Sequence, residues 1–328
     1  MDFSVRPDER MTSALKGLSS SRSLLKIVVK TRDELELTRN WIEHHAGIVG
    51  IENLLIADNA STMTEVLEIY RSFGPALNWF SFAGHHNAVN MSTAFPQLYA
   101  ALADSARFVA FLDMDERLLS LSETGWDAGD RLLQRLADSS ADLISAPWLQ
   151  NVHGRDDAFH FSEGQLEWGV LFGKPVLSTR NPFIGTRRFH TVQYPLDHAE
   201  FKGLGVLHLS HLSIPQRLRT NKNKLIQRGV ATPETTYEEI AAISTTEDLP
   251  EPLVTRRCVE EIRQLVAQQV EGASRPGGEV PGEQVVTLGT HNDLLFGSRQ
   301  AGDLLQDFLR NEQERSLRLL PKSPLYVS

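Results

Sequence analysis

The sequence predicts an α/β fold in which a mainly parallel sheet is flanked by helices. Short apolar runs alternate with helical patterns over the first half of the chain, and polar turns follow the apolar runs. Alternation of this kind implies right-handed βαβ crossovers. Ligands of such sheets gather at the carboxyl ends of the strands. Residues 31–34, 58–61 and 113–115 all fall there, so the sequence predicts a binding site at that edge.

The expected elements follow from hydrophobic periodicity and from turn residues. The expected strands are residues 24–29, 51–57, 77–82, 108–112 and 141–148, and helices are expected around residues 35–45 and over 64–72, 92–105 and 128–137. Residues 150–194 are rich in Gly, Pro, His and aromatic residues, which favours irregular loops that shape a pocket. An apolar segment, 205–212, precedes a basic helix over 217–228.

Composition excludes several classes of protein. The chain has 328 residues and a formal net charge of −9, which argues against a broad nucleic-acid surface. Its one cysteine, Cys258, excludes an internal disulfide framework and a multi-cysteine zinc site, and is expected to be structural. No apolar run approaches the roughly 20 residues of a transmembrane helix. The expected location is the cytoplasm, free or peripheral to a membrane.

Three regions are expected along the chain. Residues 1–22 are polar and lack the apolar centre of a signal peptide, so they are predicted to form a mobile arm. Residues 23–230 form the α/β domain. Residues 231–328 form a helical C-terminal extension, with amphipathic patterns at 240–242 and 254–270, a linker at 272–282 and a last helix at 303–320. Packing on the core, partner binding and dimer formation all stay open for these helices.

Two aspartates follow the apolar run at 108–112. If the strand geometry continues, Asp113 and Asp115 point to one side, where a divalent cation would relieve their repulsion. The alternative is an ordinary strand end with solvated acids. The apolar segment at 205–212 carries His208 and His211, and a histidine can complete the sphere of manganese; the alternative for each is a buried histidine with protein partners.

Other polar residues each allow a ligand-binding and a structural interpretation. Asp58 ends a strand and could accept hydrogen bonds from a ribose or a base, or could form an Asx-type turn. Arg217 and Lys222 lie on the basic helix, which could neutralise a diphosphate or present a solvated surface. The chain has no Gly-x-Gly-x-x-Gly after its first strand and no Walker-type motif, which argues against a Rossmann dehydrogenase and a P-loop enzyme.

The order of these motifs resembles that of the glycosyltransferase family 2-like proteins of the GT-A fold, which has a Rossmann-like sheet. The residues that carry the resemblance, within roughly residues 24–230, are Arg32-Asp33-Glu34, Trp41, His44-His45, Gly47, Ile56-Ala57-Asp58-Asn59-Ala60-Ser61 and Leu112-Asp113-Met114-Asp115-Glu116. The resemblance implies a hexosyltransferase-like enzyme of class EC 2.4 that moves a sugar from a nucleotide-diphosphate-sugar to the hydroxyl of a glycan, lipid-linked or small-molecule acceptor.

The resemblance also implies roles for individual residues. Arg32, Glu34 and Asp58 would bind the donor, with the last two against the nucleoside. Asp113 would face the ribose or the metal, and Asp115 would ligate Mn²⁺ or Mg²⁺ at the diphosphate. His211 would complete the sphere, with His208 as the reserve, and Arg217 and Lys222 would stabilise the leaving diphosphate.

The acceptor side is less defined. The family is usually inverting, which needs a carboxylate base near the acceptor hydroxyl. The resemblance fixes no base; Glu167, beside Trp168, is the expected one, with Glu163 and Asp157 nearby in the sequence. Asp33 departs from the family pattern, since it stands where Asn is usual.

Two other functions remain open at this stage. One is a phosphatase in which Asp113 is the nucleophile and Asp115 the acid, although such enzymes usually carry the motif at the first strand. The other is a non-catalytic protein that binds sugar nucleotides, or acts in protein interaction through its C-terminal helices. The donor sugar, the acceptor and the linkage are open in every case.

Overall fold

The structure is a computed structural model of two compact units. It describes residues 5–122, 125–127, 130–146, 148–152, 155–162, 170–181, 184–185, 193–195, 200–201, 204–209, 214–271 and 283–287. The larger unit comprises the described residues up to 209 together with 283–287, and the smaller unit comprises residues 214–271. Each unit is described by itself.

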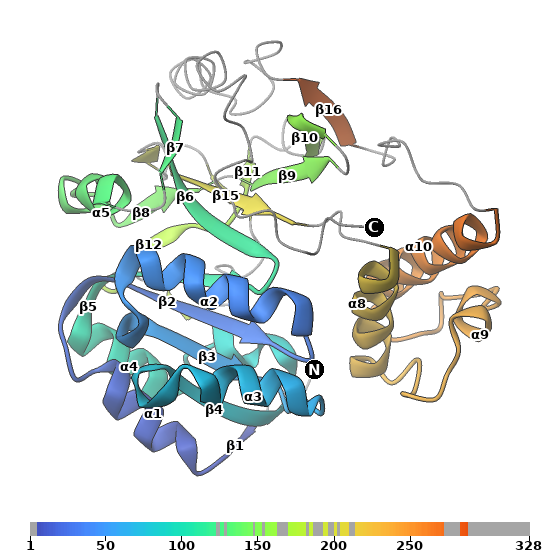
Figure 1. The fold of residues 1–328 in the computed structure, drawn as a ribbon, viewed down its shortest axis with the longest axis horizontal. Helices are drawn as coiled ribbons and strands as arrows, with labels where there is room; N and C mark the ends of the chain where they lie inside the picture. Colours follow the sequence, from blue (N-terminus) through green and yellow to red (C-terminus); the bar gives the residue numbers. More distant parts are fainter. Residues whose placement is uncertain are drawn as a thin grey trace. The chain divides into compact units, whose positions relative to one another are not determined.

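The larger unit is built on an eight-stranded sheet with the strand order β1-β4-β3-β2-β5-β12-β8-β14. The strands are β1 (Val5–Pro7), β2 (Ser23–Thr31), β3 (Leu54–Asp58), β4 (Asn78–Gly84), β5 (Ala106–Asp113), β8 (Leu143–Ser145), β12 (Val176–Ser178) and β14 (Glu200–Phe201). The four central strands β4, β3, β2 and β5 are parallel, whereas β1 and β12 run antiparallel to their neighbours. The predicted α/β class is confirmed (Figure 1).

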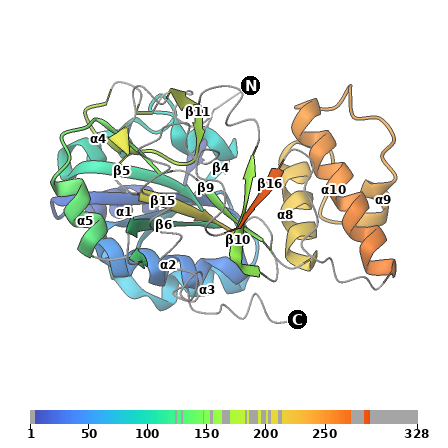
Figure 2. The ribbon, with the colours of Figure 1, turned by 90° about the horizontal axis from the view of Figure 1, so that it is seen from above.

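Helices cover both faces of this sheet. Helices α2 (Leu35–Val49) and α3 (Thr64–Ser72) lie on one face, and α1 (Arg10–Leu18) and α4 (Pro96–Ser105) lie on the other (Figure 2). The chain runs from β2 through β3 to β4 in one direction and then crosses back through α4 to place β5 on the other side of β2. The strand order therefore reverses between β2 and β5, which is the kind of switch point where open α/β sheets bind ligands.

The N-terminal segment is part of the fold, so the prediction of a mobile arm over residues 1–22 is wrong for residues 5–18. Strand β1 pairs with the edge strand β4, and α1 buries Met11, Ala14, Leu15 and Leu18. Their spacing of three, four and seven residues makes one apolar helix stripe. The buried Lys26 side chain fastens the end of α1, since its Nζ donates to the Leu18 carbonyl at 2.6 Å.

A second sheet is built partly from residues 150–194, for which irregular loops were predicted. Its order is β16-β10-β9-β15-β6-β7, with β6 (Glu116–Ser122), β7 (Gly125–Asp127), β9 (Trp148–Val152), β10 (Arg155–Ser162), β15 (Leu204–His208) and β16 (Glu283–Thr287). A short pair, β11 (Val170–Phe172) and β13 (Gln193–Pro195), and helix α5 (Asp130–Ala137) complete the unit. The regularity of these strands comes from their pairing with one another. Pairing is tertiary information, which local periodicity in the sequence does not carry.

Two histidines of α2 attach this helix to β6. His44 Nε2 donates to the Leu118 carbonyl at 2.9 Å, and the Leu118 N–H donates to His45 Nε2 at 3.2 Å. Both backbone groups of one strand residue are thus satisfied by side chains. Burial lowers the pKa of His44 to about 4 and that of His45 well below its usual range, so both imidazoles are neutral at pH 7.

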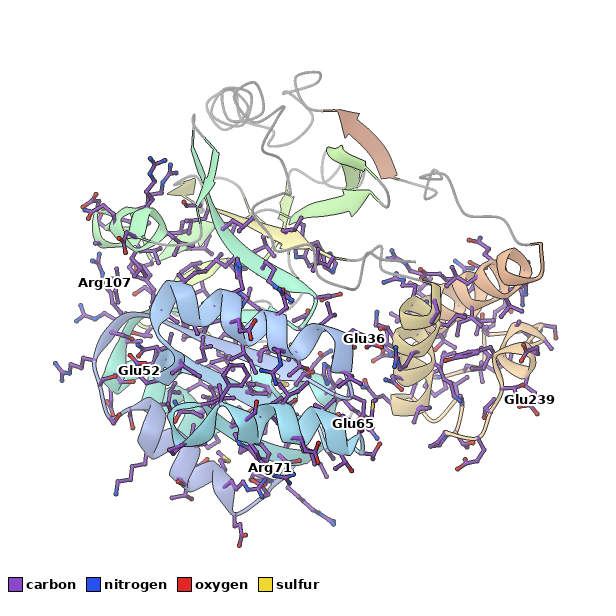
Figure 3. All side chains as sticks on the ribbon, in the orientation of Figure 1. Glu36, Glu52, Glu65, Arg71, Arg107 and Glu239 are labelled. Atoms are coloured by element: carbon purple, nitrogen blue, oxygen red, sulfur yellow. The ribbon has the colours of Figure 1, made fainter. Side chains whose placement is uncertain are left out.

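The smaller unit consists of helices α8 (Ile214–Gln227), α9 (Tyr237–Ala241) and α10 (Pro252–Glu271) around a core of its own. Leu218 and Leu225 of α8 are buried with Ile240, Val259 and Ile262, so α8 belongs here and the predicted boundary at residue 230 is too late. A capping box of Thr236 and Glu239 starts α9 (Glu239 is labelled in Figure 3). The predicted linker at 272–282 and helix at 303–320 lie outside the described residues. None of the described helices is long and apolar enough to cross a membrane.

We predict that acid weakens the larger unit through the two histidines. A group whose pKa falls from 6.5 unfolded to about 4 folded stabilises the fold above pH 6.5, and this contribution is lost as the pH falls toward 4. For His44 alone the loss at pH 5 is about 2 kcal/mol. Urea unfolding at pH 7 and pH 5 measures it, and all five tryptophans precede residue 210, so their fluorescence reports on this unit.

The matched variant is His44→Gln, whose amide can donate to the same carbonyl but does not titrate. Its free energy of unfolding should fall less between pH 7 and pH 5 than that of the wild type. An equal fall in both proteins would contradict the assignment.

Candidate functional site

The carboxyl ends of β2, β3 and β5 place the predicted residues at one edge of the sheet. Lys30 is opposite Asp113 in the β2–β5 pairing, and Thr31 is opposite Asp58 in the β2–β3 pairing. Lys30 and Asp113 therefore face each other across the switch point of the sheet. This edge is the candidate site.

The loops that follow β2 and β3 interlock. The Asn59 N–H donates to the Thr31 carbonyl at 2.7 Å, and Asp33 Oδ1 accepts from the N–H groups of Thr62 at 2.7 Å and Met63 at 2.9 Å. The Asp33 carboxylate thereby caps the start of α3 from another loop, where the helix dipole favours a negative charge. Asp33 has a φ of 53°, a conformation that Asp and Asn tolerate better than most residues.

Asp58 is fully buried and is engaged by protein donors. Its oxygens accept from the N–H of Ser61 at 2.8 Å, from the Ser61 hydroxyl, from the Tyr70 hydroxyl at 3.2 Å and from the Ser81 hydroxyl at 3.4 Å. Burial raises the pKa of Asp58, and these hydrogen bonds oppose the shift. The carboxylate thus holds the loop after β3, which is the turn-type role left open by the sequence. Its contact with a donor stays a prediction.

Asp113 lies between two lysines. Strand β5 ends at this residue and a turn at 114–115 leads into β6, so the strand geometry that would align Asp113 with Asp115 does not continue. Asp113 Oδ1 pairs with Lys30 Nζ, and Oδ2 pairs with Lys174 Nζ at 2.7 Å. The lysine side chains are 6% and 7% exposed, whereas that of Asp113 is 30% exposed. The lysines lie deeper than the carboxylate they hold.

Glu116 extends this cluster into the second sheet. Its side chain is fully buried; Oε2 accepts from the Asp113 N–H and Oε1 from Trp148 Nε1, both at 2.7 Å, and Lys174 Nζ lies 3.6 Å from Oε2. Burial raises the pKa of Glu116 and lowers that of Lys30. Burial would also lower the pKa of Lys174, but the carboxylates of Asp113 and Glu116 raise it. These carboxylates therefore favour the protonated form of Lys174.

Asp115 pairs with His208, the predicted reserve histidine. His208 Nε2 lies 3.3 Å from Asp115 Oδ2, and its ring stacks on Trp148 with centroids 4.8 Å apart. Burial would lower the pKa of His208, but Asp115 raises it. Both side chains are partly exposed, at 24% for Asp115 and 18% for His208. His211, the first choice as a metal ligand, lies outside the described residues.

Arg217 and Lys222, the basic residues predicted to stabilise the leaving diphosphate, lie in the smaller unit. Arg217 makes a two-pronged ion pair with Glu261 inside the smaller unit, one arm of which measures 3.0 Å. Lys222 Nζ donates to the Pro233 carbonyl at 2.6 Å and lies 5.6 Å from the centre of the Tyr237 ring. Glu163, Glu167 and Trp168 lie outside the described residues, and for Asp157 the structure describes the backbone of β10 only. The carboxylate base stays a prediction.

The described side chains do not fit the metal implied by the resemblance. Both oxygens of Asp113 are taken by ammonium groups, and Asp115 is paired with His208. Within the described residues, no group of three or more His, Cys, Asp or Glu side chains is placed to hold a metal ion. Mn²⁺ and Mg²⁺ bind through carboxylate oxygens that are free to coordinate.

Sequence reasoning missed Lys30, Lys174, Glu116 and Trp148 as parts of the cluster. A signal existed for Lys30, which directly follows the apolar run at 27–29 of β2, where a charge needs a partner. For Lys174, which lies between two short strands, the sequence offers no comparable signal. Arg107, which is labelled in Figure 3, donates to the backbone carbonyls of Ala137 and Ser139.

Comparison with known proteins gives distant structural matches. No family model matches the chain, and no curated protein matches it. TarS 1–349 of S. aureus in complex with UDP matches at 9% identity with a TM-score of 0.35, over 81% of this chain and 96% of that one; with UDP-GlcNAc the values are 11%, 0.32, 81% and 96%. The mannosyltransferase PcManGT of Pyrobaculum calidifontis, with GDP-Man and Mn²⁺, matches at 13% with a TM-score of 0.31, over 96% and 92%. At these values the likeness assigns no activity to this chain.

We predict that Asp33 stabilises the strand-end platform, which is formed by the interlocked loops at 32–34 and 59–63, mainly as a hydrogen-bond acceptor for the start of α3. Asp33→Ala removes the acceptor for two N–H groups at the start of α3 and should lower the free energy of unfolding by about 1–2 kcal/mol. Asp33→Asn keeps an oxygen in the same place and should lose less than half as much. Urea unfolding followed by tryptophan fluorescence measures both variants. Equal losses would show that the charge, not the acceptor, is what matters.

Proposed function

We propose that the protein is a glycosyltransferase that uses a nucleotide-diphosphate-sugar donor, in glycan or polysaccharide synthesis. The observation that carries the proposal is the polar edge at the switch point between β2 and β5, where Asp113 and Asp115 are partly exposed beside the interlocked loops at 32–34 and 59–63. The ordered motifs that resemble the glycosyltransferase family 2-like proteins fall on this edge. The resemblance and the geometry therefore support the same site.

The donor would lie across the strand ends. Arg32 and Glu34 are half-buried on the loop after β2 and would contact the nucleoside. Asp113 would accept a hydrogen bond from a ribose hydroxyl, and Asp115 would lie at the diphosphate end. Asp58 would act beneath them, since its side chain is buried among Ser61, Tyr70 and Ser81.

The reaction would be a direct displacement. The acceptor hydroxyl oxygen forms a bond to the anomeric carbon, the bond from that carbon to the diphosphate oxygen breaks, and the nucleoside diphosphate leaves with the electron pair. A carboxylate, Glu167 in this proposal, takes the hydroxyl proton. Attack from the face opposite the leaving group inverts the anomeric configuration. Holding both sugars in line supplies the remaining part of the rate enhancement.

The leaving diphosphate needs positive charge. Arg217 and Lys222 are proposed to provide it; for Arg217 this would mean exchanging its pairing with Glu261 for the phosphate. A bound Mn²⁺ or Mg²⁺ would supply the same charge in the family pattern. Because the described donors do not fit such an ion, no step here depends on it.

The phosphatase alternative loses support from the geometry. A nucleophilic aspartate needs one free oxygen to attack phosphorus, and both oxygens of Asp113 are in ion pairs. The non-catalytic alternative is distinguished by experiment: it predicts donor binding with no release of nucleoside diphosphate against any acceptor.

We predict that one class of sugar nucleotide stabilises the protein. A thermal-shift screen of UDP-, GDP-, CMP- and dTDP-sugars, each with Mn²⁺ and with EDTA, measures this. A ligand at one hundred times its dissociation constant adds about 2.7 kcal/mol to the stability of the unit that binds it. A screen in which no sugar nucleotide shifts the melting temperature would contradict the proposal.

We predict that Asp115→Asn lowers turnover by about 10²-fold or more while the melting temperature changes little. Asp115 is partly exposed at the donor edge, so its loss removes charge from the site without opening the core. Release of nucleoside diphosphate, with water or an acceptor panel, measures turnover. Asp104→Asn, which changes an exposed carboxylate of α4, is the matched control and should retain full activity. Full activity of Asp115→Asn would remove this residue from the mechanism.

A further inference from the structure

We propose that Lys30 and Lys174 are the resident cations of the donor edge, that they occupy the coordination positions of Asp113, and that the sugar nucleotide binds without a divalent metal ion. The part about donor binding rests on the proposed function. The part about Asp113 and metal ions stands on the geometry alone and is tested separately.

The two lysines reach Asp113 from the two strands that flank β5. Lys30 comes from β2, directly opposite Asp113, and Lys174 comes from the segment just before β12, which pairs with β5 on its other side. Each lysine takes one carboxylate oxygen, with Lys174 Nζ at 2.7 Å from Oδ2. The backbone holds Lys174 in place, since its N–H donates to the Ala146 carbonyl at 3.0 Å. The two lysines that pair with Asp113 are thus positioned by β2 and by the segment that leads into β12.

A metal ion at Asp113 would have to displace a lysine. A displaced Lys30 would lie buried without the carboxylate it pairs with, and a displaced Lys174 would keep only Glu116, 3.6 Å away. Removing one partner from a buried pair is strongly destabilising. The displaced lysine has little access to solvent, because the side chains of Lys30 and Lys174 are 6% and 7% exposed. Coordination of Asp113 is therefore opposed by the fold.

The charges of the cluster are already matched. Lys30 and Lys174 face Asp113 and Glu116, two cations against two carboxylates, and His208 faces Asp115. A divalent cation is attracted where carboxylates exceed their counter-charges, as in sites that hold several acidic ligands. The described part of the cluster has no such excess.

The pairing of Asp113 with the two lysines would favour the binding of an anionic ligand. An unpaired carboxylate at Asp113 would repel a diphosphate, and the ammonium groups directly beneath it cancel that repulsion. Lys30 and Lys174 act through Asp113 and are positioning residues, because their buried side chains are not required to touch the donor. A metal ion performs this compensation in other sites that bind phosphate groups.

The first experiment titrates Mn²⁺ alone into the full chain and follows free Mn²⁺ by electron paramagnetic resonance. The wild type should show no site tighter than about 1 mM. Lys174→Met should create a Mn²⁺ site at least tenfold tighter, because it frees an oxygen of Asp113, and adding Asp113→Asn to that variant should remove the site again. Lys16→Met, which changes an exposed lysine of α1, is the matched control and should bind like the wild type.

A wild-type site of micromolar affinity that Asp113→Asn abolishes would overturn the proposal. This measurement decides the matter even if the Lys174→Met variant fails to fold, because it needs only the wild type and Asp113→Asn.

The second experiment compares the stabilising sugar nucleotide in Mn²⁺ and in EDTA. The proposal expects the same melting-temperature shift in both, and at least a tenfold loss of affinity in Lys174→Met that added Mn²⁺ restores in part. A shift that appears only with Mn²⁺ would overturn it. If no sugar nucleotide binds under either condition, the proposed function fails, and the Mn²⁺ titration still decides whether the lysines exclude a metal.

Discussion

The pairing of Asp113 with Lys30 and Lys174 is the constraint around which the larger unit is organised. A carboxylate at the end of a buried strand requires compensation, and so do two lysines with buried side chains. Neither requirement can be met alone, but the strand order β2-β5-β12 meets both at once. Glu116 then carries the network to Trp148 in the second sheet. One network of ion pairs and hydrogen bonds thereby connects the polar edge of the first sheet to the second sheet.

Hydrogen bonds between polar groups also join α2 to the second sheet. His44 and His45 satisfy the two backbone groups of Leu118, and the buried Arg117 guanidinium next to it donates to Asn40 Oδ1 at 3.1 Å and to the Met114 carbonyl at 2.8 Å. Because the bonds to the Met114 carbonyl and from the Leu118 N–H are buried, the loss of either donor or acceptor would leave its partner unsatisfied. The hydrogen bond from Arg117 to the Met114 carbonyl holds the turn at 114–115 and so fixes the position of the Asp115 backbone.

The sequence predicted the central strands because their apolar runs are continuous, as parallel strands buried on both faces must be. It predicted Asp113 and Asp115 as site residues because both follow such a strand. It misassigned residues 5–18, although the stripe of Met11, Ala14, Leu15 and Leu18 is present, because the polar flanks dominate the composition. It could not identify the partners of Asp113, since the separation from Lys174 to Asp113 is bridged only by the pairing of β12 with β5.

Several residues of the motifs that resemble a donor site hold the site rather than face a ligand. Asp33 caps α3, Asp58 ties together Ser61 and Tyr70, and the Asn59 side chain donates to the Phe82 and Gly84 carbonyls at the end of β4. The motifs therefore specify the shape of the strand-end platform, and a shared motif need not mean a shared metal. The partly exposed residues above that platform are Arg32, Glu34 and Asp115, which are the ones that we propose to contact a ligand. The positive charge beneath them comes from Lys30 and Lys174, which no motif includes.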